Sequence, residues 1–128
     1  MATLPWTVPQ PPPPGARALV MASRFEVHSA AHVPRFLVKS LLAWKQVRST
    51  PGAYGVSLVA QPWKRTFWTL SAWESDEALR AYATTEPHRS IMTGLGPVMK
   101  DALFVRWEVA TDDLPVTWEE ARHRLARR

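Results

Sequence analysis

Apolar and polar residues alternate along four segments of the chain, a pattern typical of β-strands with one buried face. These segments are residues 18–27, 53–61, 65–73 and 101–110. In the first segment the odd positions are apolar, with Ser23 as the exception. In the last segment apolar residues occupy the odd positions 103–109, whereas Arg106 and Glu108 lie on the other face. The pattern therefore predicts four strands.

Between these segments the apolar residues recur every three or four positions, which predicts amphipathic helices. Residues 33–47 carry the first such stripe. A second helix is expected after Ser75, a residue type that favours the N-cap position. Pro87 ends that helix and starts a short third one that carries His88. A last helix is expected after Thr117, which stands three residues before a glutamate, as in a capping box.

The resulting order is β-α-β-β-α-β followed by a C-terminal helix. This order predicts the α+β class and a ferredoxin-like split βαβ fold, with one antiparallel sheet and helices on one of its faces. We expect the fourth strand at an edge beside the second, and the first beside the third. The strands carry apolar side chains on both parities, mixed with charges on one of them. This mixture predicts that the second sheet face is partly buried against another copy, in a homodimer.

The N-terminus differs from the rest in composition. Six of the twelve prolines lie within the first fourteen residues, and four of them form the run 11–14. We predict a stiff polyproline-type leader over residues 1–16 without a core of its own, either a flexible tail or an arm on a partner subunit. The α+β domain is expected over residues 17–111 and the C-terminal helix within residues 112–128.

Composition narrows the possible chemistry. The 128 residues suit one domain, and the absence of cysteine excludes disulfides, thiolate metal sites and cysteine nucleophiles. The net charge of +5 is scattered along the chain, so we predict no nucleic-acid partner, but an attraction for acidic small molecules. No apolar run predicts a membrane span and no secretory signal is visible, so a cytoplasmic location is expected. His28 and His32 stand four apart, but Pro34 places the helix start after them, and no metal site is predicted.

The third strand and second helix carry the sequence FWTLSAWESDEALRAY over residues 67–82, followed by Pro-His-Arg at 87–89 and FVRW at 104–107. These stretches resemble the antibiotic biosynthesis monooxygenase superfamily of dimeric α/β barrels, over about residues 17–110. Within it the similarity is greatest to spheroidene monooxygenase-like proteins and uncharacterised domains. The chain departs from that branch after His88, where a longer charged helix and a Trp-Phe pair are replaced by residues 90–97. Substrate and cofactor therefore stay open.

The resemblance places His88 beside a pocket between sheet and helices. It implies either an axial haem ligand or a general base, and the alternative is a solvated or hydrogen-bonded histidine at a helix start. Tyr82 is a candidate proton donor. Arg106 either stabilises an enolate or carboxylate, or belongs to charges on the dimer-facing side of the sheet. The candidate substrate-binding residues, which could equally form a Trp-rich core, are Phe36, Trp44, Trp68, Trp73 and Met92.

The expected function is that of a small-molecule biosynthetic monooxygenase, acting on a hydrophobic substrate of aromatic polyketide or polyene type. Dioxygen would be activated either by haem held by His88 or by the substrate's own carbanion, because no other redox group is predicted. Two alternatives remain: a cofactor-free cyclase, isomerase or dehydratase, and a non-catalytic small-molecule-binding protein.

Overall fold

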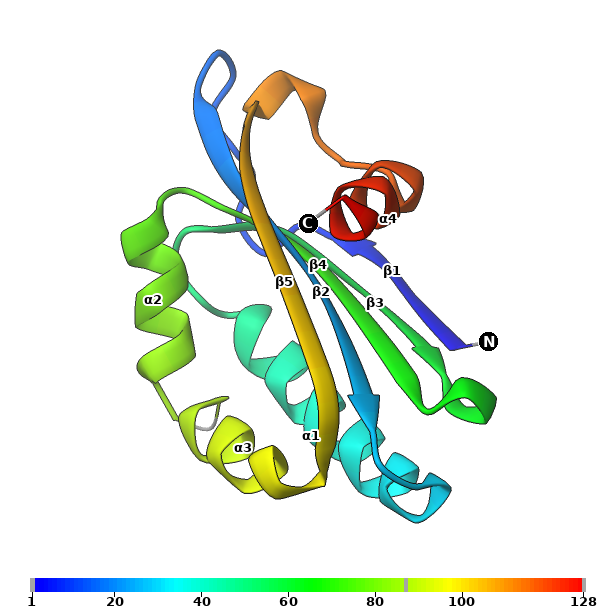
Figure 1. The fold of residues 1–128 in the computed structure, drawn as a ribbon. Coiled ribbons are helices and arrows are strands. Elements are labelled where there is room, and N and C mark those ends of the chain that lie inside the picture. The colour runs from blue at the N-terminus through cyan, green and yellow to red at the C-terminus, as the bar shows by residue number, and fades with distance from the viewer. Residues whose placement is uncertain (1, 87, 128) are drawn as a thin grey trace.

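A computed structural model describes residues 2–86 and 88–127. Within these residues, five antiparallel strands form one sheet in the order β1-β3-β4-β2-β5 (Figure 1). The strands are β1 (Ala2–Thr7), β2 (Arg17–Val27), β3 (Ala53–Gln61), β4 (Thr66–Trp73) and β5 (Met99–Ala110). The helices are α1 (Val33–Val47), α2 (Asp76–Thr84), α3 (His88–Leu95) and α4 (Trp118–Ala126). The predicted ferredoxin-like α+β fold and its C-terminal helix are confirmed.

Side-chain caps fix two of the helix starts where the sequence predicts them. The hydroxyl of Ser75 accepts a hydrogen bond from the Ala78 N–H at 3.1 Å, and that of Thr117 accepts one from the Glu120 N–H at 3.1 Å. Each bond satisfies a backbone donor that has no partner within its own helix. Within the described part of the chain, no helix is long and apolar enough to cross a membrane.

The expected neighbours of the fourth predicted strand are wrong. β5 pairs with β2 along its length, from Arg17 opposite Ala110 to Val27 opposite Met99, while β3 pairs with β4. The physical reason lies in the crossovers. In a split βαβ unit the two parallel strands leave space for one strand between them. β4 fills the space between β2 and β3, and β2 fills the space between β4 and β5.

Strand β1 lies at the other sheet edge and is not predicted by the sequence pattern. It pairs with β3, with Leu4 opposite Leu58. The indole of Trp6 covers Gly55, where an added Cβ would lie 1.9 Å from Trp6 Cζ2. Just beyond the strand, the Gln10 side chain accepts a hydrogen bond from the Gly52 N–H at 2.9 Å. Residues 2–10 are thus joined to the sheet of their own chain, and proline is tolerated there because the strand is at an edge.

The two faces of the sheet are covered by different helices. Figure 1 shows α1, α2 and α3 on one side and α4 on the other. Ala121 and Leu125 of α4 pack on the small apolar residues of β2 and β4, and Arg122 lies over the ring of Trp68, 5.5 Å from its centroid. The face that was expected to meet a second copy is therefore covered in part by this chain's own C-terminal helix. Trp107 on β5 stays half-buried beside α4.

Candidate functional site

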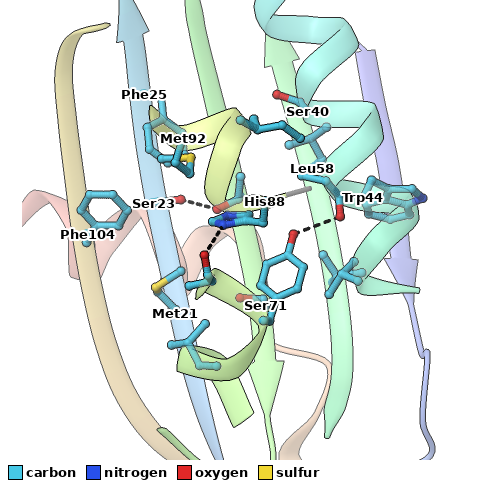
Figure 2. A pocket seen from close by; sticks show the side chains of 18 of the residues that line it. Met21, Ser23, Phe25, Ser40, Trp44, Leu58, Ser71, His88, Met92 and Phe104 are labelled. Atoms are coloured by element: carbon cyan, nitrogen blue, oxygen red, sulfur yellow. Dashed lines mark hydrogen bonds between the residues drawn. The ribbon is translucent and has the colours of Figure 1, made fainter. Parts of the chain in front are cut away.

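A cavity of about 420 Å³ lies between the sheet and helices α1, α2 and α3 (Figure 2). Its walls are mostly aliphatic, aromatic and thioether side chains. This size and this lining are typical of sites that bind small organic molecules.

The floor of the cavity consists of cross-strand rows of side chains. Met21 on β2 stands opposite Ser71 on β4 and Arg106 on β5. Ser23, two residues further along β2, stands opposite Thr69 on β4 and Phe104 on β5. Since strand side chains alternate between faces, residues of both rows point into the same space. The hydroxyls of Ser23 and Thr69 are hydrogen-bonded to each other in the middle of this floor.

The helices form the walls opposite the floor. From α1 come Phe36, Lys39, Ser40, Ala43, Trp44 and Val47; from α2 come Leu79, Arg80, Tyr82 and Ala83; from α3 come His88, Ile91, Met92 and Leu95. The Phe36 ring stacks on Phe67 of the sheet with centroids 4.3 Å apart. The aromatic contacts fix the spacing between α1 and the sheet, and so the height of the cavity.

His88 stands at the start of α3 with its ring in the cavity (Figure 2). Its Nδ1 lies 3.1 Å from the carbonyl oxygen of Ala83. A carbonyl only accepts, so Nδ1 must carry the proton, and in the neutral ring Nε2 carries the lone pair. Burial lowers the pKa of His88 from its ordinary value of 6.5, although the bond to Ala83 opposes this shift. At neutral pH the ring is therefore an uncharged imidazole that offers one acceptor nitrogen.

Tyr82 lies between His88 and Trp73, with ring centroids 4.6 Å and 5.1 Å away. Its hydroxyl donates to the carbonyl oxygen of Ala43 on α1 at 2.9 Å. Burial raises its pKa well above the ordinary 10.0, so it stays protonated. The sequence suggests Tyr82 as a proton donor to substrate, but its proton is engaged by α1, which favours a role in holding α2 against α1.

The charged side chains that line the cavity are Lys39, Arg80 and Arg106, and the described part of the chain adds no carboxylate to the lining. Asp76, just outside, accepts from Arg106 through one oxygen and from Arg80 through the other, the latter at 2.8 Å. One carboxylate thus neutralises only half of the charge of two guanidinium groups. The cavity edge keeps a net positive charge that suits an acidic ligand.

Most of the candidates named from the sequence come together here. The cavity is lined by Phe36, Trp44, Trp73, Tyr82, His88, Met92 and Arg106. Trp68 is the exception: it lies on the opposite sheet face beneath α4, where its indole N–H donates to Gln61 at 3.0 Å. The reason is strand parity, because Trp68 and Trp73 are five residues apart and an odd separation points two side chains to opposite faces.

Sequence reasoning did not name the floor residues Met21, Ser23, Ser71 and Phe104 as site residues. The signal for them was Ser23 itself, the polar exception on an otherwise apolar strand face. In the structure Ser23 is fully buried and bonded to Thr69, so this polar pair interrupts the apolar floor. Because burial of a hydroxyl without a partner is unfavourable, the bond between the two hydroxyls satisfies both of them within the floor.

The side chains around the cavity determine which metal ion or cofactor it could hold. Within residues 2–86 and 88–127, no three His, Asp or Glu side chains gather to hold a metal ion. Haem would find one imidazole nitrogen facing the cavity, at Nε2 of His88, and a cation for a propionate at Lys39. When bound, haem would supply oxygen activation.

Comparison with known proteins agrees with this fold. No protein-family model and no curated protein matches the chain. Among solved structures, SnoaB, a cofactor-independent oxygenase from Streptomyces nogalater, is 18% identical with a TM-score of 0.62, over 79% of this chain and 100% of SnoaB. An antibiotic biosynthesis monooxygenase is 14% identical with a TM-score of 0.65, over 72% of this chain and 98% of that protein. The chain has the fold of these proteins.

A third similar structure is a dimeric ferredoxin-like protein of unknown function from Thermobifida fusca, 14% identical, with a TM-score of 0.60 over 75% of this chain and 94% of that protein. The resemblance to antibiotic biosynthesis monooxygenase-like proteins is thus confirmed in the fold. Strand β1 and helix α4 are additions to the ferredoxin-like unit, at one sheet edge and on one sheet face. The cavity lies within that unit.

Proposed function

We propose that the chain is an oxygenase without a resident cofactor, and that it acts on a hydrophobic aromatic small molecule with an acidic C–H or phenol group. The observation that carries the proposal is His88: its Nδ1–H is bonded to Ala83, so a neutral imidazole offers Nε2 to an apolar cavity. Because burial lowers the pKa of His88 from its ordinary 6.5, the imidazole is uncharged at physiological pH and can act as general base.

The chemistry follows from what such a base can do. Nε2 of His88 removes a proton from an activated CH₂ group of the substrate, and the carbanion passes an electron to dioxygen. Recombination forms a C–O bond and gives a hydroperoxide. Its O–O bond then breaks with loss of water, so that R₂CH₂ and O₂ become R₂C=O and H₂O. All four electrons that reduce dioxygen come from the substrate, so no external reductant is needed, and the apolar walls keep water from reprotonating the carbanion.

The cationic residues at the cavity edge support an acidic substrate. Arg106 and Arg80 share one carboxylate, Asp76, and so retain charge for a phenolate or carboxylate of the ligand. Arg106 is well suited to this role because it lies in the same cross-strand row as Met21 on the floor. It would hold the anionic end of the substrate while its apolar rings lie between sheet and helices.

The test uses anthrone, an aromatic ketone with an acidic CH₂ group, as probe. Oxygen uptake is measured together with product formation for the wild type, His88→Gln and His123→Gln; His123 is an exposed histidine of α4 on the other sheet face. We expect equal amounts of oxygen consumed and ketone oxidised, a loss of at least about 100-fold in His88→Gln, and no loss in His123→Gln. Unchanged turnover in His88→Gln would refute the role of the base.

Two other results would point elsewhere. Turnover of a probe without oxygen uptake would favour a cyclase, isomerase or dehydratase, and tight probe binding without turnover would favour a binding protein. Titration with hemin tests the remaining alternative. A Soret band that His88→Gln abolishes would move the assignment to a haem enzyme.

We also propose a homodimer. The dimeric relative from Thermobifida fusca supports it, as does the apolar surface that β5 leaves half-exposed beside α4, at Leu103, Val105 and Trp107. Sedimentation equilibrium at micromolar concentration tests this, and a mass of 14.5 kDa at all concentrations would refute it.

A further inference from the structure

Gln46, near the end of α1, does not line the cavity, but its side chain contacts the segment that carries His88. Its side-chain Nε2 donates to the carbonyl oxygens of Tyr82 and Thr85, each at 3.3 Å. Its Oε1 accepts from the backbone N–H of His88 at 2.8 Å. All three partners are backbone groups, and they belong to the end of α2 and the start of α3.

The His88 N–H is one of the first donors of α3, and such donors have no partner within their own helix. The carbonyls of Tyr82 and Thr85 each also accept a backbone N–H, from Thr85 at 3.2 Å and from Arg89 at 3.3 Å, and they accept the Gln46 amide as a second donor. At this junction both kinds occur close together, because α2 ends at Thr84, the following Thr85 is extended, and α3 begins at His88. Only a side-chain amide can donate to the carbonyls and accept from the N–H at once. A glutamate would lack the donors, and a lysine would lack the acceptor.

The junction also holds the bond that orients the imidazole. His88 Nδ1 donates to the carbonyl of Ala83, which is the residue after Tyr82. Gln46 therefore fixes the backbone on both sides of that bond: the Tyr82 carbonyl on the acceptor's side and the His88 N–H on the donor's side. If the junction drifts, the Nδ1–H loses its acceptor and the ring is free to change tautomer and turn.

We propose that Gln46 is a positioning residue for His88: its single amide clamps the α2–α3 junction to α1, so that Nδ1 keeps the proton and Nε2 faces the cavity. This inference rests on the proposed function only for its catalytic consequence. The geometric part concerns the ligand-free protein and is tested without turnover.

The experiment compares Gln46→Met, which keeps the length of the side chain and removes its three hydrogen bonds, with Gln10→Met. Gln10 is a matched control because its amide also binds a backbone group, the Gly52 N–H, away from the junction. The readout is the ¹⁵N spectrum of the imidazoles in protein labelled with ¹⁵N-histidine. We expect one protonated Nδ1 for His88 in the wild type and in Gln10→Met, and an averaged or Nε2–H tautomer in Gln46→Met.

Kinetics with anthrone provide the second readout. Gln46→Met should lower kcat at least about tenfold with little change in KM, since the base is misplaced while the cavity walls remain. A wild-type ¹⁵N pattern and wild-type kcat in Gln46→Met would overturn the proposal, even if the variant melts earlier. If the wild type does not turn anthrone over, the proposed function fails on this probe and the ¹⁵N result alone decides the role of Gln46.

A second variant covers the case in which Gln46→Met does not fold. Gln46→Glu keeps the acceptor for the His88 N–H and loses the two donors, so the start of α3 stays attached while the end of α2 is released. We expect it to fold and to show loss of the Nδ1–H tautomer. Retention of the wild-type tautomer in folded Gln46→Glu would contradict the clamp.

Discussion

The ring centroids of Tyr82 and His88 lie 4.6 Å apart, with an interplanar angle of 48°, although the two residues belong to different helices, α2 and α3. The Tyr82 hydroxyl is bonded to α1, and the His88 ring is bonded back to α2. Three helices thus meet at one pair of aromatic rings. The imidazole is held on one side by the phenol and is open on the other to the cavity.

His88 should make the stability of the protein depend on pH. Its folded pKa lies below the unfolded value of 6.5, so the unfolded chain binds more protons at acid pH. Stability is therefore full above 6.5 and falls as the pH drops through 6.5 toward the folded pKa. Unfolding by urea at pH 7 and at pH 5 measures this dependence. Between these two pH values the free energy of unfolding should fall less in His88→Gln than in the wild type. Equal losses would mean that His88 titrates normally in the folded state.

Tyr82→Phe separates positioning from proton donation. The variant loses the hydrogen bond to Ala43, which should cost about 0.5–1.5 kcal/mol of unfolding free energy. The ring contacts with Trp73 and His88 remain. We expect turnover of anthrone to change less than about threefold at 25 °C, because the hydroxyl proton is not available to substrate. A kcat loss of two orders of magnitude with unchanged KM would instead make Tyr82 a proton donor.

Asp76→Asn should strengthen the binding of acidic ligands. Arg80 and Arg106 lose their shared carboxylate and become available to the ligand. An aromatic carboxylate such as anthracene-2-carboxylate should bind about fivefold more tightly, equivalent to roughly 1 kcal/mol for an exposed charge pair. Its carboxamide serves as the uncharged control and should bind unchanged. Calorimetry that finds equal affinities for the acid in both proteins would argue against an anion site at this edge.

Gly55→Ala tests the attachment of the N-terminal strand. The new methyl group would overlap the Trp6 indole, so strand β1 must shift, at a cost of about 1–3 kcal/mol. Gly96→Ala is the matched control, because nothing lies within 4 Å of a Cβ at that position. Guanidinium unfolding should show the loss for the first variant only. In a Trp6→Ala background the same substitution should be nearly neutral, and a full cost there would assign the strain to another contact.

The periodicity of the sequence predicts the central elements closely, since burial on one face imposes a strict spacing. The helix over residues 33–47 and the strand over residues 53–61 agree with the structure at both ends. The caps at Ser75 and Thr117 are predicted correctly because they are local: each hydroxyl accepts from a backbone N–H only three residues further along the chain.

What the sequence did not predict depends on contacts between distant segments. Strand β1 carries Pro5 and no clear alternation, and only pairing with β3 makes it a strand. Helix α4 has an ordinary apolar stripe, but the pattern alone does not say which sheet face that stripe covers. For Trp68 the necessary information was present, since its parity relative to Trp73 already assigned it to the opposite face. The Ser23–Thr69 pair in the cavity floor forms only when β2 and β4 pair in register, and the pairing of β2 with β5 brings Phe104 beside it.

The pairing of β1 has a consequence for how the protein avoids self-association. Eight of the nine residues of β3 are buried, so without β1 this strand would present an apolar border with free backbone groups to other molecules. Pro5 has no N–H to offer outward, and the chain leaves the strand soon afterwards in a proline-rich segment that cannot extend a ladder. The N-terminal strand thus protects the edge of the sheet from pairing with other molecules. A chain shortened by its first ten residues should precipitate before it loses its helices.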